Sequence, residues 1–431
     1  MRPNRYIVGG GTLYDGTTFL KDGAILIDDG EIAALGPTDP IRTHHDAPFV
    51  DVSGRLILPG LLDAHTHLYS ALAAGLQPAG PMDTFGEILA NLWWRLDAVH
   101  DEESIYFSAM AGVIEHIKAG VTTIFDHHAS MGLVAGSLDI VERAFREAGI
   151  RGTLCFETSE RTGREAVADH IEENVEFYES HRTDSFVRGT MGLHANLTLS
   201  GESLSEIAAA RPIDMPIHVH VGEAHEDLAL CEREGYEGPV DRLHRYGLVD
   251  SNALLIHALH LSKRDAAILR EVQPIVVTAP QSNWNNGVGS MDPSMVRKYA
   301  LGTDGMTGDV IETLRFQFLS LQAQGADLAP LQEALFSYRR EIQKHYFPAT
   351  GDFAVGSRAD IAVLDYIPIT PVDDSNVLPH LIYGMKRGVA FMTIVDGRVL
   401  YEDGRLTFLD EDRFQAHASK VAHRLHERFD G

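Results

Sequence analysis

The spacing of hydrophobic and polar positions divides the chain into three parts. In residues 1–57, short stretches with alternating apolar positions are broken by Asp-Gly or Gly-Gly pairs, as in GAILIDDGEIAALG. The same texture returns within residues 360–409, for example in TIVDGRVLYEDG. Alternation interrupted by such turns predicts antiparallel hairpins. We expect the two separated segments to complete one small β-sandwich that brings the chain ends together.

Between these segments, helix-like stretches alternate with short apolar runs. The runs are LILPGLLDAHTH, VTTIFDH, RGTLCFE, RGTMGLHA, PIHVHVGE, NALLIHALHL, PIVVTAP and YALGTDG. Short buried strands separated by amphipathic helices imply βα units and a parallel sheet, and this number of runs suggests a (β/α)8 barrel. We therefore predict an α/β protein with a composite β-sandwich domain (residues 1–57 plus 353–410), a barrel (residues 58–352) and an amphipathic C-terminal helix (residues 411–431).

Composition narrows the classes of partner. The chain has 62 acidic and 36 basic residues, and its formal net charge of −26 would repel nucleic acids and anionic membrane surfaces. No run of 18 apolar residues is present, and the two cysteines, Cys155 and Cys231, form no disulfide framework. We expect a cytoplasmic protein that binds neither nucleic acid nor membrane.

Polar residues with catalytic potential end nearly every apolar run. They are His65 and His67, Asp126 with His127 and His128, His194, His220 with Glu223, His257 with His260, and Asp304. The carboxyl ends of barrel strands face one mouth, where active sites are built, so residues far apart in sequence can converge there. His65 and His67 lie two apart on a strand and can grip one ion, and Asp304 would add an oxygen ligand. Taken singly, the histidines could equally be core or surface residues, and Asp304 a turn residue.

The motifs LPGLLDAHTHLYS, HVGE, LLIHALHL and LGTDG resemble those of the amidohydrolase superfamily, in its cytosine deaminase and chlorohydrolase branch. More narrowly, LANLWWRLD, GVTTIFDHHAS, GLHANLTLS and NVLPHLIYGM resemble SsnA-type aminohydrolases. The resemblance extends over the whole chain.

This resemblance implies the roles of the mouth residues. It implies one divalent ion, zinc or alternatively iron, with four protein ligands: His65, His67, His220 and Asp304. It also implies that Glu223 shuttles protons and that His257 contacts the water, the ion or the substrate. The chain has no obvious lysine at the end of the fourth strand, where binuclear relatives carry a carboxylated one, so we predict a mononuclear site. Family members often form dimers, and we expect a homodimer.

The implied reaction is hydrolysis of a carbon–nitrogen bond in a purine, pyrimidine or triazine-like heterocycle. A metal-bound water would lose a proton to Asp304, the resulting hydroxide would attack an sp² carbon of the ring, and ammonia would leave. The alternative within hydrolases is opening of a cyclic amide or ureide without release of ammonia. A non-catalytic, metal-storing barrel is a third reading, but it would be expected to lack part of this residue set.

Substrate contacts are expected from other residues around the mouth. His194 matches a substrate-contacting histidine of the family, Trp94 could cover a planar ring, and Arg95 could grip a carboxylate or oxo group. Gln281 and Asn283 follow the seventh strand and could read the edge of a heterocycle. Each of these residues could instead be a packing, interface or turn residue.

Adjacent strand residues point to opposite faces, so only one of His127 and His128 can enter the mouth. We include His128 among the candidate substrate contacts and leave open which of the two faces the pocket. In PIHVHVGEAHED, alternation puts His218 and His220 on the same side and does not choose between them. His220 lies nearer the mouth, so we predict that His218 packs or supports the ligands from one layer deeper.

Overall fold

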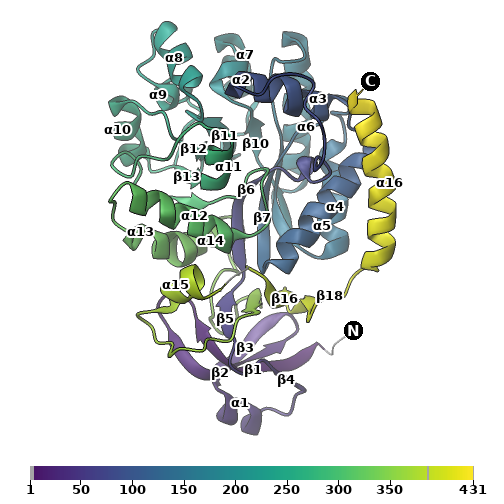
Figure 1. The fold of residues 1–431 in the computed structure, drawn as a ribbon, viewed down its shortest axis with the longest axis vertical. Coiled ribbons are helices and arrows are strands. Elements are labelled where there is room, and N and C mark those ends of the chain that lie inside the picture. The colour runs from purple at the N-terminus through teal and green to yellow at the C-terminus, as the bar shows by residue number, and fades with distance from the viewer. Residues whose placement is uncertain (1–3, 386–387, 431) are drawn as a thin grey trace.

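The computed structural model describes residues 4–385 and 388–430. A small β-sheet unit, in which the chain begins, lies at one end of a larger α/β barrel (Figure 1). The C-terminal helix runs along the flank of the barrel.

The small unit is one sheet made from both ends of the chain. It contains β1 (Arg5–Tyr14), β2 (Phe19–Asp28), β3 (Glu31–Pro37), β4 (Phe49–Asp51), β5 (Leu56–Pro59), β15 (Ile361–Leu364), β16 (Ala390–Val395), β17 (Arg398–Glu402) and β18 (Arg405–Leu406). The two ends meet where β5 pairs antiparallel with β15, with Ile57 opposite Val363. Strands from both ends enclose a common apolar cluster that includes Ile25, Ile361 and Ile394. Both chain ends therefore share one sheet and one core, and the division of this sheet into the two layers of a sandwich stays a prediction.

The strand pairing extends past the boundary expected at residue 57. Leu58 and Pro59 still pair with β15, and the chain crosses to the barrel at Gly60. A Cβ at this glycine would lie 2.1 Å from the Thr122 hydroxyl oxygen, so a larger residue does not fit the crossing. The division into separate domains stays a prediction.

The barrel contains parallel strands in two arcs. One arc has β6 (Leu61–Thr66), β7 (Val121–His128), β8 (Arg151–Phe156) and β9 (Val187–Gly189); the other has β10 (Met191–Leu193), β11 (Ile217–Val221), β12 (Leu254–His257), β13 (Ile275–Thr278) and β14 (Ala300–Leu301). β9 and β10 are one strand position interrupted at Thr190, which leaves eight positions among the described residues. Single bridges from Thr66 to Asp304 and from Thr158 to Leu193 close the ring. The predicted (β/α)8 barrel is confirmed.

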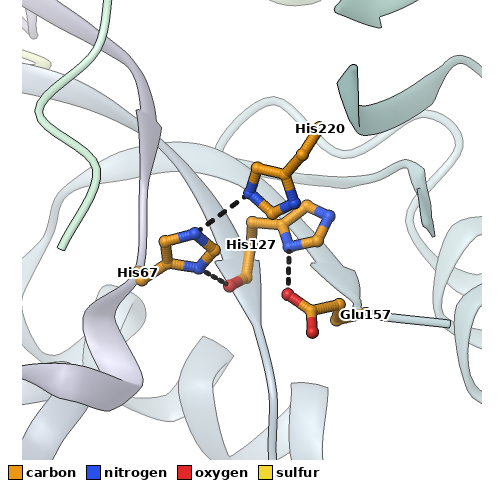
Figure 2. A group of neighbouring side chains, drawn as sticks. All are labelled: His67, His127, Glu157 and His220. Carbon is orange, nitrogen blue, oxygen red and sulfur yellow. Dashed lines mark hydrogen bonds and ion pairs between the residues drawn. The ribbon is translucent and has the colours of Figure 1, made fainter. Parts of the chain in front are cut away.

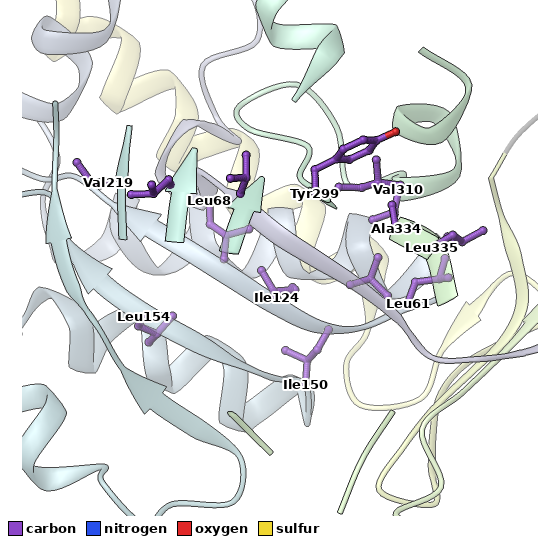
Figure 3. Close-up of a cluster of buried hydrophobic side chains, with 14 of the residues drawn as sticks. Leu61, Leu68, Ile124, Ile150, Leu154, Val219, Tyr299, Val310, Ala334 and Leu335 are labelled. Carbon is purple, nitrogen blue, oxygen red and sulfur yellow. The ribbon is translucent and has the colours of Figure 1, made fainter. Parts of the chain in front are cut away.

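Helices follow the strands and cover the barrel. They are α4 (Glu102–Lys118), α5 (Ser137–Ala148), α6 (Val167–Ser180), α7 (Gly201–Ala210), α8 (His225–Arg233), α9 (Pro239–Arg245), α10 (Lys263–Val272), α12 (Val310–Ala323) and α14 (Arg339–Tyr346). Apolar strand residues such as Ile124 and Leu154 lie in the same cluster as Val310 from α12 (Figure 3). Local caps define helix starts: Asp101 and Ser104 form a capping box at α4.

Shorter elements complete the fold. They are α1 (Thr38–His44), α2 (Phe85–Ile88), the π-helical η2 (Leu89–Trp93), α3 (Trp94–Ala98), α11 (Pro280–Asn285), α13 (Ala329–Gln332) and its π-helical continuation η5 (Glu333–Tyr338), α15 (Val377–Pro379) with η6 (His380–Gly384), and the single-turn segments η1 (Leu68–Ser70), η3 (Arg164–Ala166) and η4 (Asn196–Thr198). Of these, α2, η2 and α3 form the long excursion after the first barrel strand, near the end of the barrel away from the small sheet (Figure 1).

The expected C-terminal helix is α16 (Glu411–Asp430), beside α4. It buries Ala418, Val421, Leu425 and Phe429, whose spacing of three or four residues forms one helix face. Among the described residues, no helix is long and apolar enough to cross a membrane.

Candidate active site

Three imidazoles and one carboxylate converge at the barrel mouth. His65 lies on β6 and His67 directly follows this strand, His220 lies on β11, and Asp304 lies three residues after the end of β14. The Nε2 atom of His220 lies 3.1 Å from Nε2 of His67 and 3.3 Å from Nε2 of His65. The Oδ1 atom of Asp304 lies 3.2 Å and 3.6 Å from the same two atoms.

These separations fit one metal ion. Four donors in a tetrahedron with bonds of about 2.0–2.1 Å lie about 3.3–3.4 Å apart. The opposite ring nitrogens are fixed by carbonyl oxygens: His67 Nδ1 donates to the His127 carbonyl at 2.7 Å, and His220 Nδ1 to the His194 carbonyl at 2.8 Å. Each of these two rings, when neutral, therefore carries its proton on Nδ1 and can offer the Nε2 lone pair to a metal. The structure thus brings the four predicted ligands near one another at the mouth: His65, His67 and Asp304 form one group that could hold a metal ion, and His65, His220 and His257 form another. The assignment of all four as ligands of one ion stays a prediction.

Burial and mutual contact shift the protonation of these ligands. Burial lowers the pKa of His65 to about 3 and that of His220 well below its usual range. Burial acts against a charged His67 as well, but its contact with Asp304 and the nearby Glu157 raise its pKa to about 9. Burial would raise the pKa of Asp304, yet its contacts with His65 and His67 hold it well below the usual range. A metal at this site must therefore displace one proton, from His67.

Glu223 and His257 lie beside the ligand cluster. Nε2 of His257 is 3.5 Å from Oε2 of Glu223 and 3.8 Å from Oδ2 of Asp304. Burial raises the pKa of Glu223 to about 6, so the carboxyl can gain and lose a proton near neutrality. His257 and Asp304 both have positive φ angles, of 71° and 57°. Such backbone conformations are costly for residues other than glycine, and they concentrate at functional sites.

A pocket opens beside the cluster and has an aromatic wall. Its apolar lining consists of Tyr69, Phe85, Leu89, Trp93, Trp94 and Met306. Its polar lining consists of His67, Ser70, Asp97, Glu157, His194, His220, Glu223, His257, Ser282, Asn285, Asn286, Asp304 and Gly305. This lining contains several carboxylates and neither lysine nor arginine.

Two of the predicted substrate contacts lie in this pocket. Trp94 and His194 both line it, with ring centroids 6.2 Å apart. His194 is held by a 2.8 Å hydrogen bond between its Nδ1 and the Thr198 hydroxyl. Their contact with substrate stays a prediction.

The placement of Arg95 and His128 differs from the prediction. The Arg95 guanidinium donates to the Phe429 carbonyl at 3.0 Å and covers the Phe429 ring, so α16 holds it away from the pocket. His128 pairs through Nε2 with the Ser130 hydroxyl at 2.9 Å, on the face of β7 that is turned away from the pocket. His127 takes the inward face, where its ring lies 4.7 Å from that of His220 (Figure 2).

Gln281 and Asn283 also lie outside the pocket lining, because the chain after β13 turns directly into α11. Gln281 Oε1 accepts a hydrogen bond from the Thr313 hydroxyl at 3.0 Å. Asn283 Oδ1 lies 2.8 Å from His257 Nδ1 and so orients that ring. In place of these two residues, the neighbouring Ser282 lines the pocket.

The sequence interpretation missed a buried charge network. Arg161 pairs with Glu157, and its Nη2 lies 2.7 Å from Oδ2 of Asp97. The other carboxylate oxygen of Glu157 lies 3.3 Å from Nδ1 of His127 (Figure 2). These residues come from separate segments and form no sequence motif; an arginine four residues after Glu157 is the only local signal.

Sequence reasoning also missed Tyr69, Phe85, Asn286 and Met306 in the pocket lining. Nδ2 of Asn286 donates to Glu223 Oε1 at 3.4 Å, so this residue touches the expected proton shuttle. Three residues of α11 and the turn after it line the pocket, although the sequence offered only a polar stretch there: Ser282, Asn285 and Asn286.

A (β/α)8 barrel whose mouth gathers imidazoles and carboxylates around one ion-sized space is typical of metal-dependent hydrolases. A model of the amidohydrolase family matches residues 56–400, and the chain belongs to this family. The resemblance inferred from the motifs is therefore confirmed at the level of the family.

Similar proteins span nearly the whole chain. The 5-methylthioadenosine/S-adenosylhomocysteine deaminase of Halobacterium salinarum is 29% identical over 98% of each protein. The 5'-deoxyadenosine deaminase of Methanocaldococcus jannaschii is 25% identical, over 92% of this chain and 95% of that protein.

Solved structures share the fold. An adenosine deaminase from Xanthomonas campestris with bound zinc has a TM-score of 0.86 at 20% identity and covers 99% of both chains. The atrazine chlorohydrolase TrzN of Arthrobacter aurescens, complexed with zinc and atraton, has a TM-score of 0.82 at 21% identity and covers 97% of this chain and 100% of its own. These solved structures show the shared fold. The deaminases among the sequence relatives agree with the predicted branch, whereas the narrower SsnA-type resemblance stays a prediction.

Proposed function

We propose that this amidohydrolase removes an amino group from a neutral nitrogen heterocycle by hydrolysis and releases ammonia. The observation that carries the proposal is the meeting of His65, His67, His220 and Asp304 beside Glu223 and an aromatic pocket, with separations of 3.1–3.6 Å from His220 Nε2 and Asp304 Oδ1 to the Nε2 atoms of His65 and His67. The names of the relatives point the same way, since several are deaminases of adenosine derivatives.

One divalent ion per chain, zinc in preference to iron, would be held by His65, His67, His220 and Asp304. When bound, this ion supplies a water whose pKa falls to about 7. A second grouping, of His67, His127, Glu157 and His220, could also hold an ion. Arg161 already balances the charge of Glu157, however, and this favours a mononuclear site.

The proton steps belong to the chain's own carboxylates. Asp304 accepts the proton of the attacking water: its Oδ1 lies beside His65 and His67, and its other oxygen, Oδ2, lies 3.8 Å from His257 Nε2. Glu223 then protonates the ring nitrogen, takes up the proton held by Asp304 and delivers it to the departing amino group, a role that suits a carboxyl with a pKa of about 6. As the carbonyl of the product forms, its hydroxyl proton returns to Glu223.

His257 is assigned a hydrogen bond to the developing oxyanion. This requires a proton on Nε2, the ring nitrogen that faces Glu223 and Asp304. The Asn283 amide can turn so that Nδ2, which has no other partner among the described residues, donates to His257 Nδ1. The proton of the imidazole then lies on Nε2, where it stabilises negative charge.

The pocket lining supports a substrate without phosphate or another anionic group. Asp97, Glu157, Glu223 and Asp304 line it, and neither lysine nor arginine does. Burying an anion beside carboxylates without a compensating cation is costly. Planar, uncharged rings fit better, because Trp93, Trp94 and Tyr69 can contact their faces. Purines, pyrimidines and triazine-like rings meet this description, and nucleotides do not.

A panel of aminopurines, aminopyrimidines, aminotriazines and their nucleosides tests the proposal with the zinc-loaded protein. Ammonia release from at least one neutral compound, lost on chelation and restored by zinc, supports deamination. Gain of water without loss of nitrogen, seen by mass spectrometry, would instead establish the ring-opening alternative. A homodimeric, cytoplasmic protein remains the expectation from the sequence.

A further inference from the structure

His218 lies in the barrel interior, one layer below the metal donors, and makes no contact with the pocket. It is fully buried in the middle of β11, opposite Gly192 on one neighbouring strand and Leu254 on the other. We propose that His218 is a positioning residue for the metal ligand His65. It accepts a hydrogen bond from the protonated Nδ1 of His65 and thereby leaves Nε2 of His65 free for the ion. The inference rests on the metal site proposed above.

The geometry leaves His65 a single suitable partner. Nδ1 of His65 lies 2.9 Å from Nε2 of His218, and the two ring centroids are 5.0 Å apart. A neutral imidazole carries one proton. If His65 binds a metal through Nε2, its proton lies on Nδ1 and must be donated to His218.

The other three imidazoles of the site have a different kind of partner. His67 Nδ1 and His220 Nδ1 face backbone carbonyl oxygens, and His257 Nδ1 faces the side-chain amide of Asn283. A backbone carbonyl can only accept, so it fixes the ring opposite it in one tautomer. An imidazole can accept or donate through the same nitrogen. His65 is therefore the one ligand of the proposed set whose tautomer depends on a second titratable ring.

The two rings together have two arrangements. In the first, His65 donates from Nδ1, and His218 carries its own proton on Nδ1, an atom without a hydrogen-bond partner among the described residues. In the second, His218 donates from Nε2, and His65 carries its proton on Nε2, which lies 3.6 Å from Asp304 Oδ1. Only the first arrangement can bind a metal through His65.

The consequence concerns metal affinity. Holding a buried N–H without a partner is unfavourable, so the first arrangement is costly until an ion compensates for it. Metal binding selects this arrangement, and an acceptor at position 218 is required for it. A side chain that cannot accept a hydrogen bond would leave the Nδ1 proton of His65 without a partner.

Three substitutions at position 218 distinguish acceptance of a hydrogen bond from the mere presence of a buried side chain. In His218→Gln the amide oxygen can reach Nδ1 of His65, in His218→Asn the shorter side chain cannot, and in His218→Leu no acceptor remains. His128→Leu is the matched control, because His128 is an equally buried histidine at the end of barrel strand β7, and its side chain pairs with Ser130 outside the pocket lining.

The experiment measures the zinc affinity of each full-length protein by competition with a chromogenic chelator. The stability of the zinc-free form, measured by thermal unfolding, serves as a check on folding. We expect zinc binding about 10–100-fold weaker in the Leu and Asn variants, as is usual when the partner of a metal ligand is lost, with substantial recovery in the Gln variant. His128→Leu should bind zinc as the wild type does.

Two results would overturn the inference. If folded His218→Leu binds zinc within threefold of the wild type, or if Asn and Gln have equal effects, His218 does not act as the acceptor. If the wild type itself binds no zinc, the metal site falls and this inference falls with it. Should the Leu variant fail to fold, the contrast between Gln and Asn still decides.

Discussion

Two buried polar clusters lie at opposite ends of the barrel, and they are built differently. Near the small sheet, Arg151 is buried between Asp360 and Asp396 and also donates to the Ser185 carbonyl at 3.2 Å. The Asp396 amide donates to Asp360 at 2.8 Å, so charges and hydrogen bonds are largely matched. The second cluster, at the mouth, gathers several imidazoles, and among the described residues Nε2 of His257 has no hydrogen-bond partner, although the carboxylates of Glu223 and Asp304 lie 3.5 Å and 3.8 Å away.

The difference shows what each cluster does. The matched Arg151 cluster joins β8 of the barrel to the segment before β15 and to the turn after β16, and it requires nothing further. The groups of the mouth cluster do not satisfy one another: several nitrogen and oxygen donors face one point. Two of its residues, His257 and Asp304, also have strained backbone conformations. We infer that the first cluster stabilises the fold and that the second binds an ion.

The largest effect on activity should follow from Glu223→Gln. The amide keeps the shape of the side chain but cannot transfer a proton, so kcat should fall by about 10²–10⁴-fold. The thermal midpoint and zinc content should stay unchanged, since Glu223 is not among the proposed ligands. Steady-state ammonia release checks the first expectation, and retention of more than a tenth of the activity would rule out the shuttle role.

The largest effect on stability should come from the other cluster. Arg151→Met leaves Asp360 buried without its cation and should cost about 3–5 kcal/mol in the free energy of unfolding. Urea denaturation measures this cost, with Arg5→Ala as the control, because the exposed Arg5–Asp28 pair should contribute about 0.2–1 kcal/mol. Zinc affinity should not change in the folded Arg151→Met protein. Equal losses of unfolding free energy in Arg151→Met and Arg5→Ala would contradict the stabilising role assigned to the Arg151 cluster.

The mouth cluster should bind zinc more weakly as the pH falls. The ion must displace the proton of His67, whose pKa is about 9 in the metal-free protein. Apparent affinity should therefore rise about tenfold per pH unit between pH 6 and pH 8 and level off above about pH 9. Isothermal titration at several pH values, corrected for the protonation of the buffer, measures this slope. A slope near zero would show that His67 is already neutral.

A smaller effect is expected in the pocket wall. Trp94→Ala should raise KM by roughly 2–12-fold through loss of about 0.5–1.5 kcal/mol of ring contact, with little change in kcat. Arg95→Ala is the neighbouring comparison and should leave KM unchanged, because Arg95 contacts Phe429 and not the pocket. A larger rise in KM for Arg95→Ala than for Trp94→Ala would instead support the substrate contact first expected for Arg95.

The meeting of the four proposed ligands at the mouth could be predicted because each lies where an apolar run ends, and barrel topology alone brings such ends together. The side chains of the excursion after the first strand could not be predicted in the same way. There the π-helical turn Leu89–Trp93 precedes α3 and shifts which face each following residue occupies, which places Trp94 in the pocket and Arg95 on α16.

Alternation left His127 and His128 undecided, because the pattern fixes opposite faces and not which face is inward. Asn283 was expected in a loop, but it lies in α11 and turns toward His257. The pairing of Arg161 with Asp97 and Glu157 joins segments that only the folded barrel brings together, so no local pattern indicates it.

Anomalous scattering from a crystal of the zinc-loaded protein tests the central claim most directly. The proposed site predicts one peak per chain, about 2.0–2.2 Å from Nε2 of His65, His67 and His220 and from Oδ1 of Asp304. No peak at this position, or a peak bound instead between His127 and Glu157, would contradict it.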